Sequence, residues 1–202
     1  MVGYAEHRSG NVRESAARAL ARLARRGDGV VLGALAALLD DGVCRVRVAA
    51  LEALGALAQR CGEAYREVLN AVVSKLEDDV AAVRAAAVSA LVQIGPRGDA
   101  SVVSAVVAFF DHRDGRVRAT AVDALVQVAC AGDEFAASAL SGLLEDPYPP
   151  VCCAAVQALV HIGDRRHAAA AALTLRAEDR RDCVQAAASH ALAMLVASID
   201  DS

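Results

Sequence analysis

The sequence contains no tryptophan and few other aromatic residues, 3% in total, although 56% of its residues are hydrophobic. Alanine supplies much of this apolar content, and alanine has the highest helix propensity of any residue. Because a small side chain buries little area, a core rich in alanine needs many helix–helix contacts rather than a few large anchors. The composition therefore argues against an aromatic core and favours a helical fold.

An excess of positive charge is also missing. The formal net charge is −4, and Lys75 is the only lysine among 21 basic residues. Nucleic-acid binders usually carry a concentrated basic surface, so we expect no nucleic-acid partner.

Signals for export, for membrane insertion and for paired cysteines are absent as well. The six cysteines show no C-x-x-C spacing, and no secretory signal opens the chain. Charged residues interrupt each apolar stretch before it reaches the length of a membrane span. We therefore expect no membrane insertion, reduced thiols in small core positions, and a cytoplasmic location, with an organelle as the open alternative.

What the sequence does contain is a repeat. A segment of about twelve residues recurs six times, and each copy begins with a valine, at intervals of 33 to 37 residues. The six are Val12, Val46, Val83, Val117, Val151 and Val184. Within each copy, apolar residues recur at the spacing of an amphipathic helix. We therefore predict a helix that starts near each valine.

A second apolar stretch precedes each of the last five valines, and an acidic turn joins the two, as in Leu-Asp-Asp-Gly before Val46. We expect the turn aspartates to cap the following helix. Breaks between the pairs contain Gly62, Gly98, Gly132 and Gly163. Such a helix pair cannot bury its apolar faces alone, but stacked pairs cover one another. The sequence therefore predicts an all-α fold, a right-handed α-α superhelix of about six helix pairs in a single domain over residues 1–202.

Both ends of the chain fit this repeat. Residues 6–20 parallel residues 111–125, so residues 1–6 correspond to the end of a first helix. The chain stops after the second helix of the sixth copy. Because solenoids usually need a polar cap at each end, we expect either a piece of a longer solenoid or a component of a larger complex.

In several copies an aspartate of the turn precedes, by six residues, the arginine of a Val-Arg pair. The pairs are Asp41–Arg47, Asp78–Arg84 and, one residue further apart, Asp111–Arg118. This pattern resembles the HEAT-repeat family, in particular the short repeats of the phycobilisome-lyase type. The resemblance implies that these residues connect one repeat to its neighbour. Cys152 and Gln185 replace the arginine in the last copies, so we expect weaker connections in the C-terminal third.

Two positions of the repeat vary in charge and size, while the alanine and leucine residues beside them recur. They are the seventh and eleventh counted from each valine, and they share one helix face. The resemblance implies that second helices line the concave, partner-binding side. The expected partner-binding residues are Arg18, Arg22, Glu52, Ser89, Gln93, Asp123, Gln127, Gln157, His161 and His190. The alternative is a solvated face without a partner.

Patterns typical of enzymes are few. HEAT-like di-iron hydroxylases carry His-Glu pairs, and this sequence has no such dipeptide. No histidine lies four residues from another ligand type, so we expect no metal, no cofactor and no catalytic residue. One feature leaves redox chemistry open, because Cys152 and Cys153 are adjacent at a helix start, where the helix dipole can lower the pKa of a thiol.

The function that follows is a non-catalytic interaction scaffold, adaptor or assembly subunit for a protein partner. The alternative, which rests on the resemblance, is a chromophore-handling protein or a subunit of a lyase similar to the phycobilin lyases. The small number of aromatic side chains available to stack on a tetrapyrrole disfavours this alternative.

Overall fold

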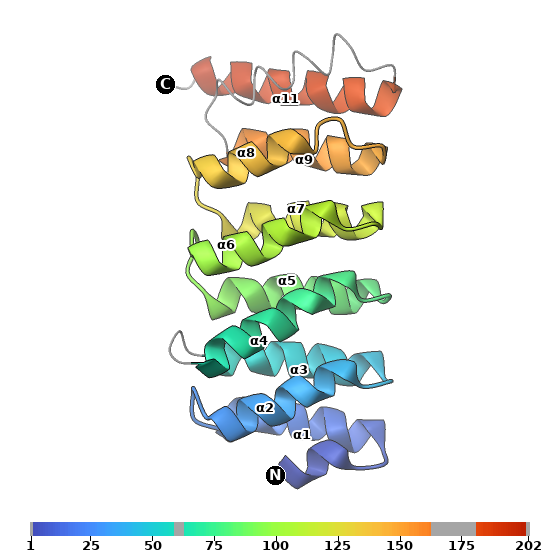
Figure 1. Cartoon of the computed structure of the whole chain (residues 1–202), viewed down its shortest axis with the longest axis vertical. Coiled ribbons are helices and arrows are strands. Elements are labelled where there is room, and N and C mark those ends of the chain that lie inside the picture. The colour runs from blue at the N-terminus through green and yellow to red at the C-terminus, as the bar shows by residue number, and fades with distance from the viewer. Residues whose placement is uncertain (1, 59–62, 163–180, 201–202) are drawn as a thin grey trace. The chain divides into compact units, whose positions relative to one another are not determined.

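The computed structural model describes residues 2–58, 63–162 and 181–200 (Figure 1). Every regular element in these ranges is a helix, which confirms the all-α prediction. None of the described helices is both long and apolar enough to cross a membrane. The chain forms two compact units, Met1–Pro96 and Arg97–Ser202. The single domain over residues 1–202 stays a prediction.

The first unit contains the first three helix pairs. Its elements are η1 (Val2–Glu6), α1 (Gly10–Leu23), α2 (Gly29–Ala37), η2 (Leu38–Asp40), α3 (Cys44–Leu57), α4 (Glu63–Val73), η3 (Ser74–Glu77) and α5 (Ala81–Ile94). The second helices form one layer, because α3 packs against both α1 and α5. The first helix α2 packs against α3 and α4.

The second unit repeats this arrangement. Its described elements are α6 (Ala100–Val107), η4 (Ala108–Asp111), α7 (Gly115–Val128), α8 (Glu134–Gly142), α9 (Pro149–Ile162) and α11 (Asp182–Asp200). Helix α9 packs between α7 and α11, as Figure 1 shows. The first helix expected near residues 166–175 lies outside the described residues.

The predicted second helices are confirmed, with one constant offset. Each begins two residues before its valine, as α3 does at Cys44 and α7 at Gly115. Five of the six valines are buried in the core, and Val46, Val83, Val151 and Val184 are fully buried. Three first helices end in a 3₁₀ turn. Residues 2–6 form the same kind of turn, in the place expected for the end of a first helix.

The prediction that turn aspartates cap the following helix is confirmed at Asp114, the N-cap residue of α7, which accepts from the N–H of Arg116 at 2.9 Å. Other capping aspartates differ from it. Asp28 and Asp99 follow a glycine in the breaks and accept hydrogen bonds from the first N–H groups of α2 and α6. In the acidic turns, the Oδ1 atom of Asp41 accepts from the N–H of Val43 at 2.8 Å, and Val43 itself is the N-cap residue of α3. Asp41 thus closes the turn and does not cap the helix, because the N–H that it binds precedes the first helical residue.

Glycine is needed in the breaks between repeats. Gly27, Gly98 and Gly132 have φ near +80°, a left-handed conformation that other residues rarely adopt. The N–H of Gly98 donates to the carbonyl oxygen of Val128, the last residue of α7, at 2.7 Å. The N–H groups of Gly27 and Gly132 bind the ends of α3 and α9 in the same way. Each of these three breaks is therefore bonded to the next repeat.

Candidate functional site

All ten residues expected to bind a partner are exposed. We call them the second-helix face. In the first unit they are Arg18 and Arg22 on α1, Glu52 on α3, and Ser89 and Gln93 on α5. In the second unit they are Asp123 and Gln127 on α7, Gln157 and His161 on α9, and His190 on α11. Because the helices of each unit pack side by side, these residues run from one helix to the next.

The exposure of this face follows from the helical periodicity of its neighbours. On α7, Leu125 and Val128 are buried while Gln127 between them is exposed. On α9, Gln157 is exposed between buried Val156 and Ala158. The apolar stripe fixes each helix against the core, so the polar side chains are held outward in a regular array.

Two helices of the first unit approach closely beneath this face. A Cβ atom at Gly55 of α3 would lie 3.1 Å from the Cα atom of Ala90 on α5 and 3.2 Å from Oε1 of Gln93. Such a distance is tighter than an ordinary van der Waals contact. Glycine at this position therefore brings α3 and α5 together, with Gln93 beside the contact.

The charges of the face differ between the two units. In the first unit, Arg18 forms an ion pair with Glu14 at 3.0 Å, and its side chain is still 62% exposed. In the second unit, burial raises the pKa of Asp123, although this side chain remains open to solvent. Surrounding protein therefore crowds this carboxylate without covering it.

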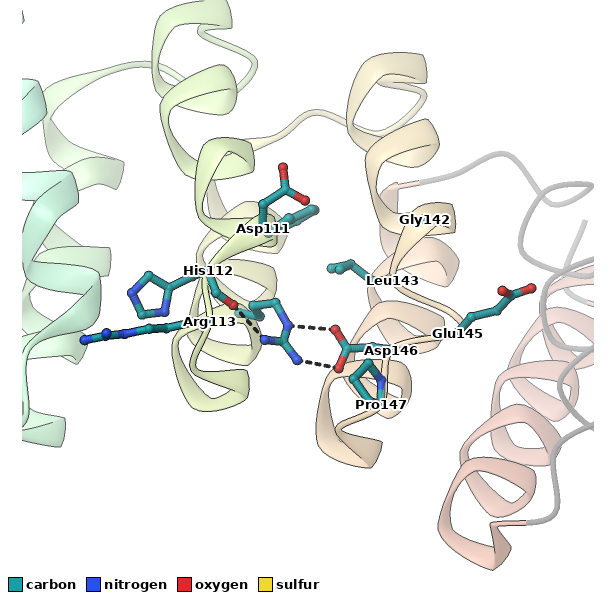
Figure 2. Close-up of a pocket in the computed structure, with 10 residues that line it drawn as sticks. Asp111, His112, Arg113, Gly142, Leu143, Glu145, Asp146 and Pro147 are labelled. Carbon is teal, nitrogen blue, oxygen red and sulfur yellow. Dashed lines mark hydrogen bonds and ion pairs between the residues drawn. The ribbon is translucent and has the colours of Figure 1, made fainter.

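A second set of polar residues connects neighbouring repeats along the acidic turns. Nη2 of Arg13 lies 2.8 Å from Oδ1 of Asp41. Nη2 of Arg47 lies 2.8 Å from Oδ1 of Asp78. In the second unit, Nε and Nη2 of Arg118 each lie 2.7 Å from an oxygen of Asp146, drawn as dashed lines in Figure 2. We call these three the inter-repeat bridges.

The six-residue spacing seen in the sequence does not join the arginine to the carboxylate of the same turn. It joins the arginine to the backbone of that aspartate. Arg47 and Arg84 each donate to the backbone carbonyl oxygen of the aspartate six residues earlier, Asp41 at 2.9 Å and Asp78 at 2.8 Å. The carboxylate that Arg47 binds belongs to the following repeat. Within one copy the spacing thus fixes the orientation of the arginine, and the bridge itself spans two copies.

Asp111 does not take the position of the other turn aspartates. It is exposed, and His112 occupies the equivalent place. The carbonyl oxygen of His112 accepts from Arg118 at 2.6 Å, and its Nδ1 accepts from the N–H of Asp114 at 3.0 Å. An imidazole nitrogen thus closes this turn as a carboxylate closes the others.

Burial and hydrogen bonding together set the charge of the bridge carboxylates. Hydrogen bonding to Arg13 lowers the pKa of Asp41 below its usual value. Burial alone would raise the pKa of Asp146, but the hydrogen bonds from Arg118 and from the N–H of Tyr148 outweigh it, so the pKa is lowered. Both groups are therefore ionised near neutral pH.

The profile of HEAT repeats matches residues 31–126, 70–152 and 103–193, which together span 31–193. The chain belongs to the HEAT-repeat family. A comparison with curated proteins gives no match.

Solved structures share the fold of this HEAT-repeat chain. The N-terminal domain of MAST/Orbit is 22% identical over 99% of this chain and 95% of its own, with a TM-score of 0.64. A TOG domain of crescerin is 21% identical over 90% and 84%, with a TM-score of 0.61. A designed armadillo repeat protein in complex with the peptide (KR)4 is 24% identical over 96% and 97%, with a TM-score of 0.52.

The sequence alone missed three residues of the HEAT-repeat connections. Arg13 belongs to a Val-Arg pair like the others, so the repeat alignment could have found it. Asp146 also lies in the aspartate column, but the sequence analysis paired it with Cys152 and missed its bridge to Arg118. Weaker connections where Cys152 and Gln185 replace the arginine stay a prediction. Arg181 had no sequence signal. It donates to the carbonyl oxygen of Asp146 at 2.9 Å, the kind of contact that the missing arginine at Cys152 would make. Asp179, the remaining turn aspartate, lies outside the described residues.

A cavity of about 430 Å³ opens beside the Arg118–Asp146 bridge and is lined by both turns of that region (Figure 2). Its polar lining includes His112, Arg113 and Glu145. Throughout the part of the chain that the structure describes, no three His, Cys, Asp or Glu side chains lie together as metal ligands would. The candidate functional site is the second-helix face, whose ten residues are exposed.

Proposed function

We propose that this HEAT-repeat chain is a non-catalytic scaffold or assembly subunit that binds a protein partner through the second-helix face. The observation that supports this most is the exposure of all ten residues of the face. They stand on helices whose apolar side is buried, so within each unit the polar side chains are held in place before any partner arrives. Preorganisation of this kind lowers the entropic cost of binding.

The second-helix face carries hydrogen-bonding and charged side chains that can bind a polypeptide. The side-chain amides of Gln127 and Gln157 each offer donors and an acceptor for hydrogen bonds. Arg18 and Arg22 offer guanidinium groups, which pair with carboxylates in a planar geometry. The first unit would therefore bind an acidic segment of the partner.

Similar folds support a protein partner over a small molecule. The designed armadillo repeat protein forms a complex with a peptide, and crescerin uses a TOG domain array to regulate microtubules. The net charge of −4 disfavours nucleic acid, because phosphate binding depends on basic residues.

The test is affinity capture from a lysate, with mass spectrometry, using the wild-type chain and the double variant Arg18→Glu, Arg22→Glu. We expect one or more proteins to be retained by the wild type and depleted at least about tenfold by the variant, since like charges across an interface cost several kcal/mol.

The matched control is the variant Arg8→Glu, Arg66→Glu, which makes the same change of charge at exposed residues outside the second helices. Circular dichroism would establish that both variants fold. A partner lost equally from both variants would contradict the proposal, because net charge and not the face would then govern binding.

A further inference from the structure

Three cysteines meet where α9 packs against α11 in the second unit. Cys152 and Cys153 are the fourth and fifth residues of α9, and Cys183 is the second residue of α11. The two helices share a buried cluster that contains Cys152, Val156, Val184 and Ala188, with Cys153 packed against it. The proposed scaffold function does not use these thiols.

Cys153 lies directly against Cys183. Its Sγ atom is 3.4 Å from the backbone carbonyl oxygen of Cys183. The Cα atoms of a disulfide-bonded pair are usually 4.4–6.8 Å apart, and a sulfur this close to the backbone of the other residue is compatible with that separation. The Cys183 thiol itself interacts with the Cys153 thiol, so the two side chains lie near each other.

The surroundings of the two thiols differ in a way that orders their reactivity. Cys183 is exposed and Cys153 is half-buried. Burial raises the pKa of the Cys153 thiol, and the nearby Cys183 thiol raises it further. An oxidant from solution therefore meets Cys183 first, since access and thiolate character decide which thiol reacts.

Cys152 is engaged elsewhere. It is fully buried, its Sγ donates to the carbonyl oxygen of Asp146 at 3.0 Å, and Arg181 donates to the same Sγ at 3.3 Å. Its side chain also points away from that of Cys153, because consecutive residues of a helix do not face each other. The pair of adjacent cysteines noted in the sequence is therefore not the reactive pair.

We propose that Cys183 is a site of reversible thiol modification by small disulfides of the glutathione type, and that Cys153 resolves it into an intramolecular Cys153–Cys183 disulfide. In the first step the Cys183 thiolate attacks one sulfur of glutathione disulfide, forms a mixed disulfide and releases one glutathione. In the second step Cys153 attacks Sγ of Cys183 and releases the second glutathione. Two protein thiols are oxidised, and one glutathione disulfide is reduced to two glutathione molecules. The product links α9 to α11.

The test uses the full chain, reduced and then incubated with glutathione disulfide, quenched with an alkylating agent and mapped by mass spectrometry. For the wild type we expect a loss of two hydrogen atoms and a cross-linked peptide that joins residues 153 and 183. The variant Cys153→Ser cannot close the ring, so Cys183 should instead retain one glutathione. The variant Cys183→Ser should keep Cys153 reduced.

The control is Cys130→Ser, which removes a different exposed thiol and should form the 153–183 link as the wild type does. Circular dichroism of each variant separates loss of the link from loss of folding. A link between Cys152 and Cys153, a link between two chains, or stable glutathionylation of the wild type at Cys183 would each overturn the proposal.

Discussion

Two adjacent aspartates, Asp78 and Asp79, allow the stability contributed by a buried bridge to be compared with that contributed by a surface ion pair. Nη2 of Arg47 binds Oδ1 of Asp78 at 2.8 Å and Oδ1 of Asp79 at 3.1 Å. The side chain of Asp78 is 7% exposed and that of Asp79 is 89% exposed. The substitutions Asp78→Asn and Asp79→Asn therefore each remove one negative charge that pairs with Arg47. The first charge is buried and the second is exposed.

The expected losses differ severalfold. Asp78→Asn removes a charge-assisted hydrogen bond and leaves Arg47, itself 12% exposed, without its buried counter-charge. We expect a loss of about 2–3 kcal/mol in the free energy of unfolding. The amide can still accept from the N–H of Val80, which limits the loss. Asp79→Asn should cost less than about 1 kcal/mol, as surface pairs do.

At low pH, the loss of stability caused by Asp78→Asn should disappear. Burial alone would raise the pKa of Asp78, but hydrogen bonds from Arg47 and Val80 outweigh it, so its pKa in the folded chain is lowered. A carboxylate with a lowered pKa contributes stability that is present above its unfolded pKa, about 3.9, and is lost as the pH falls through the folded pKa. Below about pH 4 the wild type should approach Asp78→Asn in stability.

The assay is urea unfolding followed by circular dichroism, for the wild type and both variants, at pH 7 and at several lower values. Equal losses for Asp78→Asn and Asp79→Asn at pH 7 would refute the argument, because burial would then not distinguish the two pairs. A difference that persists unchanged into acid would refute it as well.

Other substitutions test the helix contacts by the same unfolding measurement. Gly33→Ala should stabilise by about 1 kcal/mol, because no atom lies within 4 Å of the added Cβ and alanine favours the helix. Gly55→Leu should destabilise by about 1–3 kcal/mol, since its side chain meets the backbone of Ala90, and a gain in stability would contradict the close approach of α3 and α5. Gly98→Ala should cost about 1–2 kcal/mol, because φ is +79°. Asp123→Asn should be slightly more stable than the wild type at pH 7. Because burial raises the pKa of Asp123, ionisation of this carboxylate lowers the stability of the folded chain as the pH rises through that pKa. A variant less stable than the wild type at pH 7 would contradict this.

The second helices could be predicted from sequence because each copy repeats the same local pattern. The valine column fills fully buried positions in most copies, and helix propensity and periodicity agree there. The exposed face followed from the same columns, since a position that accepts Glu52, Gln157 and His190 in turn cannot lie in an apolar core.

The inter-repeat bridges could not be predicted fully, because their partners come from different copies. Arg13 and Asp41 lie 28 positions apart, and only stacking of the helix pairs brings them together. The six-residue spacing drew attention to the carboxylate of the same turn, where the arginine in fact binds the backbone carbonyl oxygen. The contact between Cys153 and Cys183 is of the same kind, since it depends on the packing of α9 against α11.

The most direct test of the scaffold function is site-specific photo-crosslinking in cells. A photoreactive residue would replace Gln127 or Gln157 on the second-helix face, or Ser138, which is exposed on the first helix α8. We predict that both glutamine positions capture the same protein and that Ser138 does not. Capture of that protein from Ser138 as efficiently as from Gln127, or no capture from either glutamine position, would contradict the account.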